Sequence, residues 1–498
     1  MKNNYYKTPK ARTKPKDPIL FGLVAKAVRA GIEAVHKRQR SGQFIARHYK
    51  FPKLDRFHNG MPHLCIATGD EAPFDYRHAL NSSDSPVNCD TMPDFIELVN
   101  YAKESQHSFL KARNDREMLV KHIADPEEKS RIADFLFRYD VNQLPLSVIE
   151  RWLHSNNGND TPDNEDILAW YLLLESSILD DESELVSDVI IPIIMVSFDF
   201  DELSFTLDGI DASLSRMTQG IQLARAPDDW TSSTHRVVVG CATHALELKN
   251  VSSLADLTTR MDGSILPIVE SFFSSMRICL AAETGYAQLL LQPKGWARSF
   301  KASLPFIETV RTMKQYPAWF ENFAWLSNEI RSFSEEEALS VVQTCNSLRS
   351  AKGDVSRRLN IAGRRISYCH LRDKLEDAVL DIGIALESLL SDSSRSAISD
   401  KLAQRVAALS RFYPSGDNAW LIYRKIKNFY HLRSEIVHGS SKEDSEALEL
   451  FRYALYHTRN VIRVLTEKPR YLQEPGRIEL ELLLGKPSDL DPDKSSKS

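Results

Sequence analysis

The stretch NFYHLRSEIVHGSS, residues 428–441, decides how the C-terminal part of the chain should fold. Placed on a helix, its apolar residues continue a stripe that begins upstream, and together they share one helix face. The stripe consists of Ile422, Ile426, Phe429, Tyr430, Ile436 and Val437. Arg433 falls in the middle of it. The pattern therefore predicts a helix that packs in a core and carries one arginine on its buried face.

Arg433 and His438 are the two residues of this helix whose side chains are suited to ligand binding or catalysis. Burying an isolated guanidinium is strongly unfavourable, so Arg433 should face a carboxylate, an interface between protomers or an anionic ligand such as phosphate. Gly439 follows His438 directly and is typical of the position after a helix end, which predicts that His438 lies at a corner. An Arg and a His five residues apart also occur by chance in many chains, so their spacing alone is weak evidence for a site.

The surrounding residues make the pattern more specific. The segment Tyr430-x-x-Arg433-Ser434-x-x-x-His438-Gly439 resembles the R-x4-6-H signature of the HEPN superfamily, in particular its Apea-like branch. Four upstream stretches resemble the same branch and occur in the expected order: residues 359–365, 375–381, 384–390 and 402–405. The resemblance covers about residues 335–470, and nothing before about residue 300 is covered with comparable specificity.

The resemblance implies an all-α helical bundle that pairs with a second copy, so that two R-x4-H motifs line one cleft and form a metal-independent endoribonuclease. Arg433 and His438 match the catalytic residues of the motif. Further residues match positions that support this site in the family, namely Glu387, Tyr430, Ser434 and Asp381.

The chemistry of RNA cleavage suits these residue types. RNA carries its own nucleophile, the 2′-OH, so the protein needs only to remove a proton, stabilise charge on the phosphate and protonate the leaving 5′-oxygen. His438 can exchange protons, and Arg433 can bind two phosphate oxygens at once. We expect 2′,3′-cyclic phosphate and 5′-hydroxyl ends, and we expect DNA to survive.

Helical register gives the acidic residues a second interpretation. Asp377 and Asp381 lie one turn apart, opposite the apolar face of their helix. We favour ion pairs with arginines such as Arg365 or Arg405 over contact with substrate. Glu387 lies between the two faces and could orient either residue of the motif.

Two basic clusters flank the motif. Residues 401–433 hold seven Lys and Arg residues against one acidic residue, and residues 357–374 hold six against one. Such clusters are often only solvated helix faces, but beside a cleft they could follow the phosphates of a nucleic acid. The residues that we expect to bind RNA are Arg405, Arg424, Lys425 and Lys427.

Upstream, charge and periodicity divide the chain. Residues 152–215 contain fifteen acidic residues and no Lys or Arg, so this segment either shields the basic C-terminal domain or is a solvated surface. The periodicity from about residue 264 to the end is mostly helical, and residues 236–240 favour a strand. The predicted parts are a flexible basic arm (1–16), a mostly helical region (17–156), an acidic region with a small β-sheet (157–290), a HEPN-like helical domain (291–475) and a disordered tail (486–498).

Composition bounds the protein class. The chain has 498 residues, with 63 Lys and Arg against 68 Asp and Glu, so no global basic field would bind nucleic acid indiscriminately. Six cysteines without a CxxC pair favour a reducing compartment, and we expect the protein in the cytoplasm. The most apolar run, residues 189–196, is too short to span a membrane and contains a proline.

The sequence predicts neither a metal nor an organic cofactor. His58, His63, Cys65 and Cys89 lie at spacings too irregular to be more than weak evidence for zinc. The phosphate-binding, dinucleotide-binding and metalloprotease motifs are not present in the sequence.

We therefore expect an α+β protein whose C-terminal all-α HEPN helical bundle follows a mixed N-terminal region with a small sheet. We expect a homodimeric ribonuclease acting on tRNA or single-stranded RNA, in antiviral defence or as a toxin, with a phage-derived or cellular trigger at the N-terminal region. The alternative is a non-catalytic HEPN module that dimerises and binds a nucleotide or a partner. Arg433 and His438 at motif spacing favour the enzyme, because a scaffold would need neither.

Overall fold

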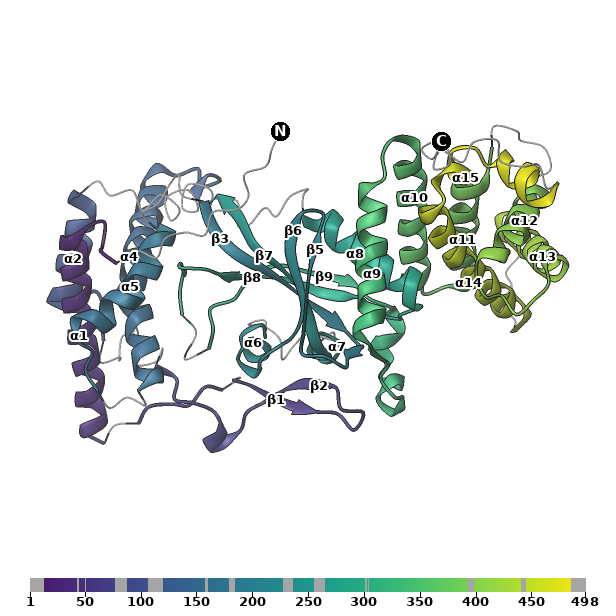
Figure 1. The fold of residues 1–498 in the computed structure, drawn as a ribbon. Coiled ribbons are helices and arrows are strands. Elements are labelled where there is room, and N and C mark those ends of the chain that lie inside the picture. The colour runs from purple at the N-terminus through teal and green to yellow at the C-terminus, as the bar shows by residue number, and fades with distance from the viewer. Residues whose placement is uncertain are drawn as a thin grey trace, which may run out of the picture.

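The computed structural model contains three parts that follow one another along the molecule, as Figure 1 shows: N-terminal helices at one end, a β-sheet in the middle and a helical bundle at the other end. The α+β class with a C-terminal helical region is thereby confirmed. The residues that the structure describes are 13–42, 44–49, 51–76, 87–105, 120–156, 160–178, 184–226, 236–254, 265–300, 302, 304–392, 398–439 and 445–484. Most of the predicted basic arm and the predicted C-terminal tail lie outside them.

The N-terminal part is built from amphipathic helices around one core. Asp17 caps the first helix by accepting hydrogen bonds from the backbone of Ile19 and Leu20, and Pro18 occupies the first turn, where it costs no hydrogen bond. The helices are α1 (Pro18–Arg40), α2 (Pro93–Glu104), α4 (Pro126–Ser155) and α5 (Asn164–Ile178), and a hairpin of β1 (Pro52–Arg56) and β2 (Pro62–Ile66) lies beyond them.

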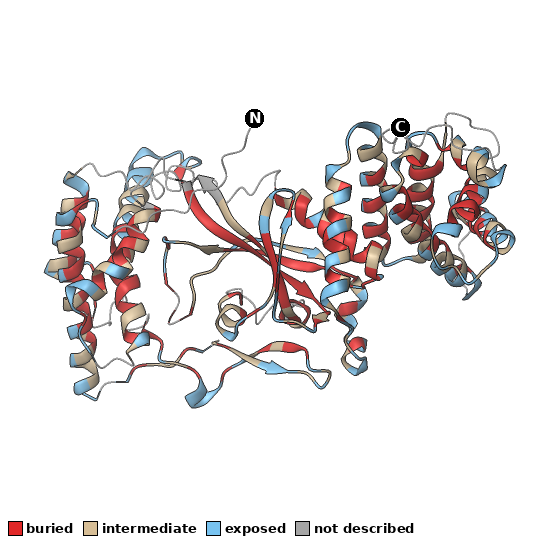
Figure 2. Ribbon diagram, viewed as in Figure 1, coloured by how far each residue is buried: buried red, intermediate tan, exposed pale blue. Residues whose placement is uncertain are grey.

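The middle part is an antiparallel sheet with the strand order β5-β6-β7-β3-β8-β9. In the central strand, Val189 and Ile191 pack in the same core as Phe272 of helix α8, whereas Ile190 packs with Leu290 in a separate cluster. Both faces of this strand are therefore buried (Figure 2), which explains its continuous apolar sequence. The elements are β3 (Glu184–Ile194), β5 (Glu202–Leu207), β6 (Ile210–Arg216), β7 (Ala242–Leu254), β8 (Tyr286–Pro293), β9 (Glu308–Gln315), α6 (Gln219–Ala224), α7 (Arg236–Gly240) and α8 (Ile265–Leu280). Short β4 (Ser197–Phe198) and β10 (Ser332–Phe333) pair in parallel beside the sheet.

Two local predictions in this part are wrong. The sheet does not end before residue 290, because β9 pairs with β8 across a long loop, and exposure alternates along β9 as in an edge strand. Residues 236–240 form α7 and not a strand, because the buried guanidinium of Arg225 donates to the carbonyls of Val239 and Gly240 at the end of this short helix. The helical part therefore begins at residue 335 and not at residue 291.

The C-terminal part is a bundle arranged around α11. This helix packs against α10, α12, α13 and α14, and its residues Val379, Ile382, Ala385, Leu386 and Leu389 are fully buried. The bundle comprises α9 (Glu335–Ser350), α10 (Gly353–Leu371), α11 (Leu375–Leu390), α12 (Ile398–Leu409), α13 (Ala419–Val437), α14 (Ser445–Glu467) and α15 (Pro469–Gln473), with a π-helical turn at Ile478–Leu483. No helix in the described part of the chain combines the length and the apolar character needed to cross a bilayer.

Candidate active site on the C-terminal bundle

The helix that carries the motif, α13, ends where the sequence predicts. The Asn418 side chain caps its first turn by accepting from the backbone of Leu421, and His438 follows its last residue. Gly439 adopts a φ of +90°, in the left-handed region that glycine occupies at little cost. His438 is exposed at this corner, and its backbone N–H donates to the carbonyl of Ser434 at 3.1 Å.

The predicted apolar stripe of α13 is buried over most of its length. Ile422, Ile426 and Phe429 are fully buried and belong to the bundle core. Val437 is an exception, because this last residue of the helix is exposed to solvent. The stripe therefore ends before the corner that carries His438.

Arg433 faces a carboxylate, the first of its three predicted partners. Its Nη2 lies 3.2 Å from Oε1 of Glu387 on α11. Gly383, one turn before Glu387, lets the two helices approach, because a Cβ at this position would lie 3.2 Å from Cγ of Arg433. The side chains of Arg433 and Glu387 are 29% and 32% exposed, so water and solutes reach both.

The guanidinium of Arg433 is not saturated by this contact. Its Nε is buried and has no hydrogen-bond acceptor among the residues that the structure describes. Leaving a charged donor buried without an acceptor costs free energy. The Nε of Arg433 faces α11, 3.4 Å from where a Cβ of Gly383 would lie, so a phosphate oxygen would meet the partly exposed end of the guanidinium first and would reach Nε only after a shift of the side chain.

Tyr430 fixes the spacing of the two helices. Its hydroxyl donates to the carbonyl of Gly383 at 3.3 Å, and the side chain is buried between α11 and α13. Burial, together with the charge of Glu387, raises the pKa of Tyr430 well above its ordinary value, so the phenol stays neutral. Its support of the site is thus one of packing. Ser434, by contrast, is exposed.

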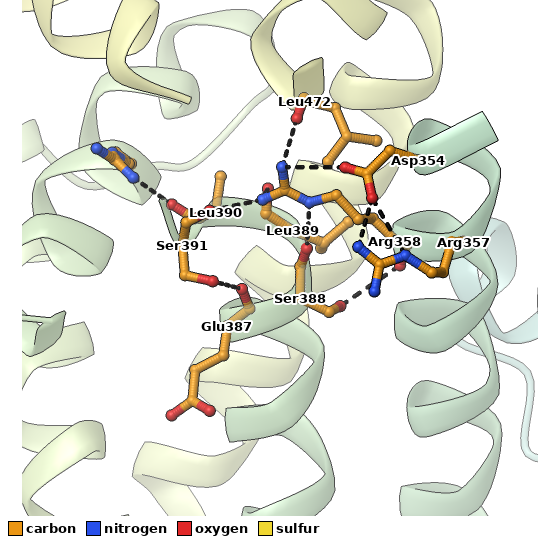
Figure 3. A network of polar contacts seen from close by, with 10 residues as sticks. Asp354, Arg357, Arg358, Glu387, Ser388, Leu389, Leu390, Ser391 and Leu472 are labelled. Atoms are coloured by element: carbon orange, nitrogen blue, oxygen red, sulfur yellow. Dashed lines mark hydrogen bonds and ion pairs between the residues drawn. The ribbon is translucent and has the colours of Figure 1, made fainter. Parts of the chain in front are cut away.

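The C-terminal turn of α11, which carries Glu387, is held by Arg358 of α10. The Arg358 guanidinium donates to the carbonyls of Ser388 and Ser391, both at 2.7 Å, and to those of Leu389 and Leu472. These are the carbonyls that a helix end leaves without partners. Figure 3 shows the Glu387 carboxylate pointing away from this network, so the turn is fixed while the carboxylate stays available to Arg433. Sequence analysis placed Arg358 only in a basic cluster and missed this role.

Asp381 does not reach the motif. It is buried and accepts from Nη1 of Arg365 at 2.7 Å and from Nε of Arg372 at 2.8 Å. This is the ion-pair arrangement favoured from helical register, and it makes Asp381 a structural residue and not a supporting residue of the site.

The prediction that Arg405 contacts RNA is not supported by its position in the bundle. Its side chain is 2% exposed and pairs with Asp392 and Glu479, each at 2.6 Å. A guanidinium enclosed in this way is inaccessible to a polyanion. The sequence does not indicate that Arg405 is enclosed, because its partner Glu479 lies far away in the chain.

The other three predicted RNA contacts lie on α13. Arg424 is exposed, Lys427 is exposed and pairs with Asp400 at 2.6 Å, and Lys425 is half-buried beside the ring of Tyr453. Arg424 and His438 are fourteen residues apart, so they share one face of the helix. His431 lies midway between them and is exposed too, but it is not part of the R-x4-H motif.

The described residues of the acidic segment, 152–156, 160–178 and 184–215, do not cover the motif. Asp208, at the turn between β5 and β6, pairs with Arg349 of α9 at 2.6 Å. Helix α13 lies at the end of the molecule far from the sheet (Figure 1).

A group of residues able to hold a metal ion occurs elsewhere, in the N-terminal part. Within the described ranges, ligand atoms of His48, Glu150 and His154 lie within 4.8 Å of one another, and Nδ1 of His48 is 3.4 Å from Asp75. The histidines and cysteines singled out in the sequence do not belong to this group.

Compared with protein-family models, curated proteins and solved structures, the chain matches none of them.

Proposed function

We propose that the C-terminal bundle is a metal-independent endoribonuclease in which His438 transfers protons and Arg433 binds the phosphate. The observation that carries this proposal is the state of Arg433. It is half-buried at a bundle surface, held by one carboxylate, and keeps a donor without an acceptor among the described residues, on the helix that ends at His438.

The proposed steps follow from the residue types. A neutral His438 imidazole removes the proton of the 2′-OH, whose oxygen attacks the adjacent phosphorus and displaces the 5′-oxygen. The 5′-oxygen leaves with a proton supplied by an imidazolium. Arg433 donates to the phosphate oxygens as negative charge develops there, while Glu387 keeps the guanidinium in place. The products are a 2′,3′-cyclic phosphate and a 5′-hydroxyl.

These steps favour a homodimer. One histidine must accept a proton and one must donate a proton in the same turnover, whereas the proposed site offers one motif histidine per chain. A second copy placed around a two-fold axis would bring a second His438, as the HEPN resemblance implies. The exposed position of His438 at a helix corner leaves room for this pairing.

The proposed substrate is tRNA or single-stranded RNA in the cytoplasm. The exposed Arg424 and Lys427 precede His438 on α13 and could contact phosphates of the same strand. The N-terminal helices and the sheet would then carry the part that responds to a phage-derived or cellular trigger, in antiviral defence or toxin activity.

A second candidate function is a non-catalytic module that dimerises and binds a nucleotide or a partner. The Arg433–Glu387 ion pair fits this alternative as well, because a purely structural arginine would also face a carboxylate.

Cleavage of RNA in EDTA by the full chain tests the first proposal. Wild type should cleave tRNA or single-stranded RNA and leave cyclic phosphate ends, while His438→Ala and Arg433→Ala should cleave about 100-fold to 10,000-fold more slowly. His431→Ala is the matched control, since it removes another exposed histidine of α13 and should change the rate by less than about threefold. An RNA with 2′-deoxyribose at the cleavage site should stay intact.

Equal rates for wild type and His438→Ala would refute the proposed site. RNA binding without cleavage by any variant, in a stable dimer, would favour the non-catalytic module.

A further inference from the structure

A cavity of about 520 Å³ lies where α10 packs against α8, at the junction of the sheet and the bundle. Its walls come from α8, from Tyr286 and Gln315 at the ends of β8 and β9, and from α9 and α10. The volume is in the range of small-molecule sites. The cavity is separate from the Arg433 site, since none of its lining residues lies on α13.

Arg277 of α8 lines this cavity as a buried cation. It is 3% exposed, and its Nη2 donates to the carbonyl of Thr284 at 2.8 Å, whereas its buried Nε has no acceptor in the described part of the chain. No carboxylate of the described residues forms an ion pair with it. Burial lowers the pKa of Arg277 to about 10, which still leaves it charged at neutral pH. A buried charge of this kind is costly unless an anion accompanies it.

Tyr286 supplies a second open donor to the same cavity. The residue is 2% exposed, and its hydroxyl is buried without a hydrogen-bond partner among the described residues. Burial raises the pKa of Tyr286, so the phenol is neutral and its O–H can donate. Its ring packs against Phe273, with centroids 4.8 Å apart. Two buried donors that lack acceptors therefore line one cavity.

The remaining charged residues of the lining are also mostly basic. They comprise Arg349, Arg357 and Arg364 against one carboxylate, Glu270. Arg349 and Arg357 pair with Asp208 and Asp354, while Arg364 is exposed on α10. The lining thus holds four arginines against one carboxylate, and two of its residues carry a buried donor without an acceptor among the described residues. The partly exposed ring of Tyr368 adds an aromatic face.

We propose that this cavity binds a small organic oxyanion, a phosphate monoester or a carboxylate attached to an aromatic body. The oxyanion would accept from Arg277 and Tyr286, because guanidinium and hydroxyl donors match phosphate and carboxylate oxygens. The body would lie against the apolar and aromatic lining, near Tyr368. A small molecule fits better than RNA, because both donors are too deeply buried for a polymer backbone to reach.

The position of the cavity gives the ligand a structural consequence. It would touch α8, which covers the sheet, and α10, which holds α11 through Arg358 and Arg365. The bound molecule would thus contact both the sheet part and the C-terminal bundle. The proposal does not depend on RNA cleavage.

Titration calorimetry with the full chain tests the proposal. The probes are phenyl phosphate, benzoate and phenol, which share one ring and differ in the head group. Phenyl phosphate or benzoate should bind with one molecule per chain, and phenol should bind at least about tenfold more weakly. Tighter phenyl phosphate would assign a phosphate monoester, and tighter benzoate would assign a carboxylate.

Variants place the probe in the cavity. Tyr286→Phe removes only an open hydroxyl, so it should fold at least as stably as wild type and bind about 10-fold to 100-fold more weakly. Arg277→Met should abolish binding, but it also removes a buried side chain and lowers stability, so Tyr286→Phe is the variant that tests the binding site. Tyr76→Phe, a buried tyrosine of the N-terminal part, and Arg131→Gln, an exposed arginine of α4, are controls that should bind normally. No binding of either anion at millimolar concentration, equal binding of phenol, or unchanged affinity in Tyr286→Phe would each overturn the proposal.

Discussion

Arg405 and Arg433 lie in the same helical bundle and were both expected to act on RNA, yet the structure treats them differently. Arg405 uses Nε for Glu479, Nη2 for Asp392 and Nη1 for the carbonyl of Leu390, so each nitrogen of its guanidinium has a partner. Arg433 has one carboxylate and a buried Nε without an acceptor among the described residues. The two arginines differ in exposure and in the number of their partners, and not in charge or in their position in a basic cluster.

Two carboxylates on α11 repeat this contrast. Asp381 is buried under two arginines, whereas Glu387, six residues later, is partly exposed and, among the described residues, forms an ion pair with Arg433 alone. The bundle therefore has an interior network that stabilises it and a surface pair that costs little to change. Substitutions in the interior network should therefore lower stability more than substitutions in the surface pair.

The largest effect is expected from Arg405→Met. Removing this guanidinium leaves Asp392 and Glu479 without their shared cation and the Leu390 carbonyl without a donor. The free energy of unfolding should fall by about 3–5 kcal/mol in urea titrations. Arg424→Met, at an exposed position of α13, should change it by less than about 0.5 kcal/mol. A loss below about 1 kcal/mol for Arg405→Met would show that its partners rearrange toward water.

The second-largest loss of stability is expected at Asp381, compared with the other carboxylate of α11, Glu387. Asp381→Asn should lower the free energy of unfolding by about 2–3 kcal/mol, because it removes the charge from two hydrogen-bonded arginine contacts at a buried position. Glu387→Gln should lower it by less than about 1 kcal/mol, because both members of its ion pair are partly exposed. Equal losses in thermal or urea unfolding would contradict the division into interior network and surface pair.

The sequence could predict the parts of this site that depend on local periodicity. The end of α13 at His438, the buried stripe through Phe429 and the need of Arg433 for an anionic partner all follow from residues within two turns of one another. The favoured ion pair of Asp381 with Arg365 also follows from helical register.

The parts that could not be predicted depend on distant residues. The burial of Arg405 requires Glu479, which is 74 residues away, and the strand character of β9 requires its pairing with β8. In β9, the residues ETVRTMKQ fit a half-exposed strand as well as a polar helix, so only the neighbouring strand decides. The same holds for α7, where Arg225 overrides the strand preference of three consecutive valines.

The third prediction concerns pH and the interior of the bundle. Burial lowers the pKa of His457 from its ordinary value near 6.5 to about 4, so the folded state holds the neutral imidazole, bonded to the Tyr413 hydroxyl at 2.8 Å. The unfolded chain binds the proton more tightly, so this stability is complete above pH 6.5 and is lost as the pH falls toward 4. Between pH 7 and pH 5 the loss should be about 2 kcal/mol.

His457→Gln is the matching variant for the pH experiment. It keeps a hydrogen-bonding group near Tyr413 but cannot be protonated in this range, so urea titrations between pH 7 and pH 5 should show a smaller loss than in wild type. His370 is half-buried, and desolvation lowers its pKa to about 3, so it acts in the same direction and should leave a residual slope. An unchanged pH dependence in His457→Gln would contradict the assignment.

The smallest effect on stability is expected from Tyr430→Phe. Tyr430 is buried between α11 and α13, close to the Arg433–Glu387 pair at the surface. The substitution removes the hydrogen bond to the Gly383 carbonyl but keeps the ring in the core, so the free energy of unfolding should fall by about 1 kcal/mol. Tyr139→Phe, at an exposed position of α4, is the control and should cost less than about 0.5 kcal/mol. Because Gly383 is also where Arg433 contacts α11, RNA cleavage should fall by less than tenfold, far less than in Arg433→Ala. A loss of cleavage as large as that of Arg433→Ala, with stability unchanged, would instead show that the Tyr430 hydroxyl takes part in catalysis. Tyr430 would then belong to the active site and not to the residues that stabilise the bundle.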